Sequence, residues 1–137
     1  MNEEEARQSY FELKVLEEQM NQVKQQISNI ENQISELEEA SKNIDELKEK
    51  GGSETFVPVT MGVYSKAKLE DTKSFIVNVG AGIAVEKSAD ETKKLIEQQV
   101  SEMKNYHEQM SRGLQLMGAR AEEIENKVMK EENVQIS

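Results

Sequence analysis

The clearest pattern in the sequence is an unbroken 3–4 spacing of apolar residues in the first third of the chain. The spaced positions are apolar except for Ser41: Leu13, Leu16, Met20, Val23, Ile27, Ile30, Ile34, Leu37, Ser41 and Ile44. This spacing places one apolar seam along a coiled-coil helix. Asn2 followed by Glu5 is typical of a capping box, and Gly51 after a basic last turn is typical of a helix stop. The pattern predicts an N-terminal coiled-coil helix over residues 1–50.

The same spacing returns in the last third of the chain, where His107 is the only polar member of the series. The series comprises Ile96, Val100, Met103, His107, Met110, Leu114, Met117, Ala121, Ile124 and Val128. Ser88 and Glu91 form a second capping box, so we expect a second coiled-coil helix and tail over residues 88–137. If Lys50 and Ser88 lie side by side, antiparallel pairing makes the numbers of opposing residues add to about 138, and both chain ends lie at one far tip.

Residues 51–87 lie between these helices and show the period-2 alternation of strands. Two hairpins are predicted, and Pro58, which has no ladder donor, marks its strand as an edge or a bulge. The expected strands are Thr55 to Thr60, Val63 to Leu69, Lys73 to Val79 and Ile83 to Lys87. The whole chain is therefore predicted to be one α+β domain, a long antiparallel two-helix coiled coil with two β-hairpins between the helices.

The apolar residues of the hairpins need cover from other subunits. An isolated hairpin is marginally stable in water, and both helices are expected to use their apolar stripe on each other, leaving no helix face for the strands. Unpaired strand edges join copies together when the partner is specific. The residues expected to form the oligomer interface are Phe56, Val57, Val59, Phe75, Ile76, Val77, Val79, Ile83 and Val85.

Charge and composition exclude several classes of partner. The net charge is −10, with 13 acidic and 6 basic residues in the first 50, which disfavours a nucleic-acid partner because phosphates are also negative. No apolar run approaches the roughly 18 residues of a membrane span, and the acidic start does not resemble a signal peptide. The absence of cysteine fits a reducing compartment. We expect a cytoplasmic protein with no membrane contact.

The sequence offers no catalytic, metal or cofactor site. No nucleophile with a base and an orienting partner can be assembled from the spacing. His107 is the only histidine, which makes a packing role far more probable than a metal site. Gly80-Ala81-Gly82 lacks the further residues of a phosphate-binding loop and instead predicts a hairpin turn. We therefore expect a protein that is not an enzyme and uses no cofactor.

Two segments of the middle region point to a known family. They are Phe56-Val57-Pro58-Val59 and the run from Ile76 to Lys87, which leads directly into the capped second helix. With the two matched helices, they resemble the alpha-class subunit of prefoldin, particularly its archaeal form. The resemblance implies a hexamer of two alpha and four beta subunits, whose hairpins join into a β-barrel. It also implies capture of unfolded polypeptides between the coiled-coil tips, without ATP, and delivery to a group II chaperonin.

Capture of many unrelated chains needs accessible, dispersed apolar side chains at the tips. The candidates are Tyr10, Phe11, Leu13, Leu16, Ile124, Val128, Met129, Val134 and Ile136. Leu13, Leu16, Ile124 and Val128 also fit ordinary seam positions. Three of the other candidates, Phe11, Met129 and Val134, fall off the seam and are the better ones. An alternative function is a structural coiled-coil adaptor or tether that binds one defined protein partner.

Two glycines interrupt the second helix. Gly113 and Gly118 each cost roughly 1 kcal/mol relative to alanine in a helix. They flank the seam in a region where methionine replaces isoleucine and leucine, at Met103, Met110 and Met117. Two explanations remain open at this point, close approach of the two helices or flexibility that serves function.

Overall fold

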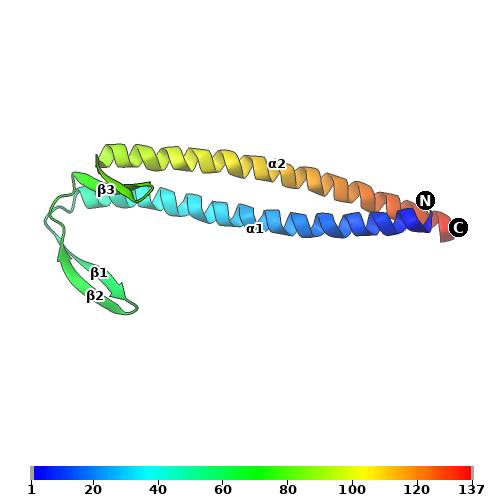
Figure 1. Ribbon diagram of the computed structural model, residues 1–137, viewed down its shortest axis with the longest axis horizontal. Helices are drawn as coiled ribbons and strands as arrows, with labels where there is room; N and C mark the ends of the chain where they lie inside the picture. The colour runs from blue at the N-terminus through cyan, green and yellow to red at the C-terminus, as the bar shows by residue number, and fades with distance from the viewer. Residues whose placement is uncertain (1, 137) are drawn as a thin grey trace. The chain divides into compact units, whose positions relative to one another are not determined.

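The computed structural model describes the backbone of residues 2–136 and the side chains of residues 2–130. Figure 1 follows the elements from blue to red. They are α1 (Glu3–Lys48), β1 (Glu54–Thr60), β2 (Val63–Lys68), β3 (Ser74–Gly80), β4 (Ile83–Ser88) and α2 (Ala89–Ile136). The order confirms the predicted α+β architecture of two long helices with two antiparallel hairpins between them.

The chain divides into two compact units. The terminal unit contains Met1–Gln33 together with Met103–Ser137, and the hairpin unit contains Ile34–Glu102. Each unit therefore holds a segment of α1 and a segment of α2, and the hairpin unit also holds all four strands.

In the terminal unit, α1 and α2 pair antiparallel in the register predicted from the two helix ends next to the hairpins. Glu31 Oε1 lies 2.9 Å from His107 Nε2, and Arg120 Nη2 donates to Glu12 Oε1 at 3.0 Å. The residue numbers of the first pair, 31 and 107, add to 138, as predicted. Those of the second pair, 12 and 120, add to 132, which is six residues lower, or less than two helical turns. The seam residues of this unit are buried or half-buried, among them Ile30 and Ala121. The apolar spacing defines the seam, and the placement of Lys50 beside Ser88 gives the register.

In the hairpin unit, the same register continues next to the strands. Lys93 Nζ lies 2.9 Å from Asp45 Oδ1, and Lys48 Nζ lies 3.4 Å from Asp90 Oδ1. Ile44, a seam residue of α1 in the same unit, is buried. Exposed ion pairs of this kind contribute little stability each, so the buried seam residues provide most of it.

The hairpins are tied to the helix ends by specific hydrogen bonds. The hydroxyl of Thr72, a buried residue between the hairpins, donates to the carbonyl of Lys48 at 3.2 Å. A Cβ atom on Gly51 would lie 3.1 Å from Thr72 Oγ1, so glycine permits this close approach. At the start of α2, the Glu91 amide donates to Ser88 Oγ at 3.1 Å, which confirms the predicted cap.

Both hairpins carry a bulge close to their turn. The β1–β2 register shifts between Pro58 and Thr60, as expected where proline removes a ladder donor, and the β3–β4 register shifts between Asn78 and Gly80. Strand β3 runs one residue past the predicted end because Gly80 pairs with Ile83 beyond this bulge. The β3–β4 turn contains Ala81, whose φ is 53°. Positive φ at the central residues suits the twist of a tight hairpin.

Candidate functional site

The first candidate surface lies near the start of α1 and the end of the described part of α2, in the terminal unit. We call Tyr10, Phe11 and Met129 the tip surface. The side chain of Phe11 is 70% exposed and that of Met129 is 62% exposed, and Tyr10 is also exposed. All three lie off the apolar seam, so their apolar groups are available to a ligand without unpairing the helices.

The remaining tip candidates are placed differently. Leu13 and Leu16 are half-buried, and Ile124 and Val128 are buried, with Ile124 only 3% exposed. These four residues therefore pack between the helices, and a ligand could reach Ile124 and Val128 only if the helix ends separated. The side chains of two further candidates, Val134 and Ile136, lie outside the described residues.

Met129 lies at an open groove on α2 that the sequence analysis missed. The groove has a volume of about 500 Å³ and is lined by Glu123, Asn126, Lys127, Met129 and Lys130. These residues recur every three or four positions beside the seam, which is the signal that could have revealed them. Lysine stems offer apolar surface while their ammonium groups remain in water. The groove therefore combines apolar, cationic and anionic groups.

An ion-pair cluster connects the two helices of the terminal unit. Arg120 donates to Glu12 from α1 and, through Nη1 at 3.3 Å, to Glu123 of its own helix. The hydrogen bond to Glu12 and then that to Glu123 raise the pKa of Arg120 above its ordinary value. The guanidinium is thus a permanent charge that favours the antiparallel register near the tip surface.

The second candidate surface is formed by the strands of the hairpin unit. Ile76 is 80% exposed, Phe56 and Val59 are both 66% exposed, and Val57, Val79 and Ile83 are exposed as well. Phe75, Val77 and Val85 are half-buried. Large apolar side chains on two-stranded sheets, next to unpaired strand edges, are typical of surfaces that other chains cover.

One expectation about these strands was wrong. The second hairpin is not without helix cover, because Val77, Asn78 and Val79 of β3 line a groove of about 430 Å³ together with Thr92, Leu95, Ile96 and Gln99 of α2. Leu95 lies beside the seam, so α2 has apolar surface left for β3 after it has paired with α1. The cover is partial, since Val79 remains exposed although it lines the groove, and Ile76 is exposed as well.

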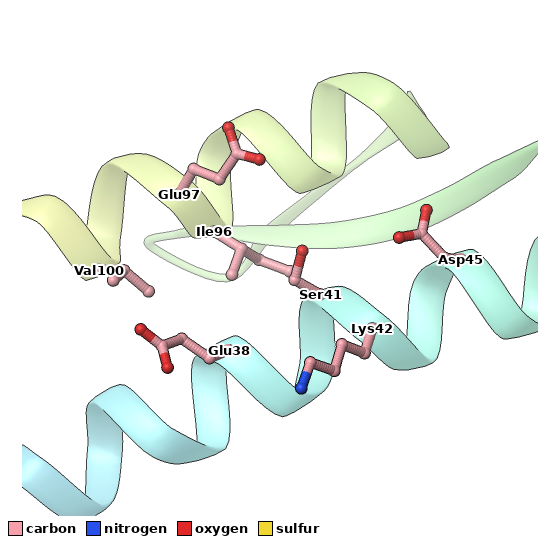
Figure 2. A pocket seen from close by; sticks show the side chains of 7 residues that line it. All are labelled: Glu38, Ser41, Lys42, Asp45, Ile96, Glu97 and Val100. Atoms are coloured by element: carbon pink, nitrogen blue, oxygen red, sulfur yellow. The ribbon is translucent and has the colours of Figure 1, made fainter.

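A groove between α1 and α2 in the hairpin unit lies at Ser41, the one polar seam position of α1. Figure 2 shows the side chains around it, which are Glu38, Ser41, Lys42 and Asp45 from α1 and Ile96, Glu97 and Val100 from α2. Its volume is about 370 Å³. Ser41 is too small to fill the seam opposite the larger apolar residues of α2, which explains the groove.

We expect Ser41→Ile to stabilise the protein by about 1 kcal/mol, because an isoleucine at this position would bury apolar area that serine leaves empty. The melting temperature, followed by far-UV circular dichroism, should rise. The matched control is Ser35→Ile, at an exposed position of the same helix, which should leave the melting temperature nearly unchanged. A melting temperature that falls in Ser41→Ile would contradict this account of the groove.

Within residues 2–130 the structure shows no group of three or more histidine, cysteine, aspartate or glutamate side chains that could hold a metal ion. Among the described residues, neither α1 nor α2 contains a stretch apolar and long enough to cross a membrane.

Together, two long paired helices and two hairpins with exposed apolar faces define a coiled-coil protein with β-hairpins between its helices. The family model described as prefoldin subunit matches residues 16–133, so the chain belongs to the prefoldin family. Prefoldin is a family of non-enzymatic chaperones whose subunits assemble into oligomers.

Individual relatives agree with the alpha class. The chain is 36% identical to prefoldin subunit alpha of Thermofilum pendens over 87 residues, which are 64% of this chain and 66% of that protein. It is 33% identical to prefoldin subunit alpha of Methanobrevibacter smithii over 75 residues, 55% of this chain and 51% of that protein. The chain thus spans between half and two thirds of the length of these two relatives.

A solved structure shares the fold. A chain in the cryo-EM structure of filamentous PFD from Methanocaldococcus jannaschii superposes with a TM-score of 0.75 at 21% identity. The superposition covers 82% of this chain and 94% of that one. At this level of identity the likeness supports the arrangement of two helices and two hairpins.

Proposed function

We propose that this chain is a subunit of an ATP-independent holdase, which captures unfolded polypeptides through its tip surface. The observation that carries the proposal is the exposure of Phe11 and Met129 off the seam. Side chains at such positions can bind and release a ligand while the seam stays closed. Tyr10, the residue before Phe11 in α1, is also exposed.

The chemistry of these residues suits ligands without a defined shape. Methionine is flexible and polarizable, so Met129 can adapt to different apolar side chains. The lysines beside it, Lys127 and Lys130, can contact acidic or carbonyl groups of a bound chain. A few separated contacts of this kind give reversible binding, because each contributes only about 1 to 3 kcal/mol.

The proposed function requires assembly through the hairpins. We expect the exposed faces of β1–β2 and β3–β4 to be covered in a β-barrel formed with prefoldin beta subunits, in a hexamer of two alpha and four beta chains. Phe56, Val59 and Ile76 would then be buried. We further expect the complex to act in the cytoplasm, to need no cofactor, and to pass its captured chains to a group II chaperonin.

An aggregation assay tests the proposal directly. A denatured protein such as citrate synthase is diluted into buffer without ATP, with and without the assembled complex, and light scattering is followed. We expect the complex to suppress scattering at near-stoichiometric amounts. Full aggregation in its presence, together with tight binding of one defined protein, would favour the adaptor or tether instead.

A further inference from the structure

Four exposed basic residues lie around the tip surface, two on each helix. We call them the tip cations: Arg7, Lys14, Lys127 and Lys130. In α1, two of them lie about one helical turn before and after Phe11, so their side chains share one side of the helix with the phenyl ring. In α2, the other two line the groove that contains Met129. Each apolar part of the tip surface therefore has two cations beside it.

The tip cations are available to a ligand. In the part of the chain whose side chains the structure describes, none of the ion pairs uses a tip cation. Glu12 and Glu123, which lie close to the tip surface, both accept hydrogen bonds from Arg120. Glu125 lies one turn before Met129 but does not line its groove. A carboxylate from another molecule can therefore pair with the tip cations without displacing an internal partner.

We infer, on the basis of the proposed function, that the tip surface selects apolar stretches of unfolded polypeptide that also carry aspartate or glutamate. Apolar side chains of such a stretch contact Phe11 or Met129. Carboxylates a few residues away in the stretch pair with the tip cations, and Arg7 can hold a carboxylate through two parallel hydrogen bonds. Stretches rich in lysine or arginine are disfavoured, because they bring like charges together.

The net charge of the chain alone would favour the opposite choice. At −10 it attracts basic polypeptides at long range. At the tip surface, however, distance and screening decide. Glu4 and Glu18 lie seven residues from Phe11, or about 10 Å along the helix at roughly 1.5 Å per residue, which exceeds the screening length of about 8 Å at physiological salt. Side chains one turn away, as in the tip cations of α1, are only about 5 to 6 Å apart.

Photocrosslinking with three matched peptides tests the selectivity. The photoreactive amino acid p-benzoylphenylalanine is placed at position 8, an exposed site one turn before Phe11, and the chain is assembled with its beta-class partners. The peptides share one unfolded apolar sequence and differ only in the polar residues beside it, which are glutamate, glutamine or lysine. The glutamate peptide should crosslink about fivefold more than the lysine peptide, with the glutamine peptide between them. Sodium chloride at about 0.5 M should reduce this difference to less than about twofold.

Two variants with the same net charge assign the preference to the tip cations. The first is Arg7→Gln, Lys14→Gln, Lys127→Gln, Lys130→Gln, in which the preference should fall below about twofold. The matched control removes four exposed lysines elsewhere on the two helices and should keep the preference of the parent chain: Lys24→Gln, Lys42→Gln, Lys94→Gln, Lys104→Gln.

The outcomes separate the selectivity from the proposed function. Equal crosslinking of the three peptides, or a preference for the lysine peptide, would overturn the selectivity and leave capture at the tip surface standing. A preference that survives replacement of all four tip cations would overturn their role. Absence of crosslinking with every peptide would overturn capture at the tip surface and therefore the proposed function as well.

Discussion

The double substitution Phe56→Asp, Ile76→Asp should abolish assembly with beta-class prefoldin subunits. Each replacement removes about 1.5 to 3 kcal/mol of apolar burial and requires a carboxylate to be buried in its place, which costs several kcal/mol more. Because both side chains are exposed in the single chain, the variant should have the same helix content as the parent chain. Size-exclusion chromatography with multi-angle light scattering should show the variant and the beta subunits as separate species.

The control for this experiment is Tyr106→Asp, which changes an exposed aromatic residue on α2 in the terminal unit. This variant should assemble as the parent chain does. A hexamer formed by the double aspartate variant would show that the strands are not the assembly interface.

Removal of residues 1–12 and 126–137 should abolish capture of unfolded protein while the oligomer survives. The deletion eliminates all of the tip surface and leaves the strands untouched. The finer variant Phe11→Ser, Met129→Ser should raise the amount of complex needed to suppress light scattering by about tenfold or more, because it removes two exposed apolar contacts of about 1 to 3 kcal/mol each.

The matched control is Tyr106→Ser, an exposed residue of the same unit that lies outside the tip surface. Its capture should equal that of the parent chain. If the truncated chain instead runs as a free monomer, the terminal segments take part in assembly, and the separation of capture from assembly proposed above is wrong.

The helices could be predicted because apolar spacing and caps are local signals. Their pairing follows from the seam and the positions of the helix ends. The apolar 3–4 spacing defines the seam, and the flanking caps define its ends, so even the contact between His107 and Glu31 follows from counting. The hairpins were predictable for the same reason. Alternating side chains, Pro58 and the turn glycines are all short-range signals.

The features that were missed depend on three-dimensional placement. Leu95 lines a groove together with β3 only because the second hairpin folds back beside the first turns of α2, and no spacing in the sequence reports that direction. The groove at Met129 was also missed, because Lys127 and Lys130 look like ordinary solvated charges in one dimension. Similarly, the sequence left two explanations for Gly113, and only the empty space around it, where an added Cβ atom would meet nothing within 4 Å, excludes close approach of the helices there.

The exposed strands have a consequence for the cell that makes this chain. A single copy presents Phe56, Val59 and Ile76 to water, and these are the same kinds of side chain that the tip surface is proposed to recognise in other proteins. If the chain acts as proposed, a copy made in excess of its partners would itself be bound by the assembled complex. Balanced synthesis of the two kinds of subunit would keep such orphan copies from competing with genuine cargo.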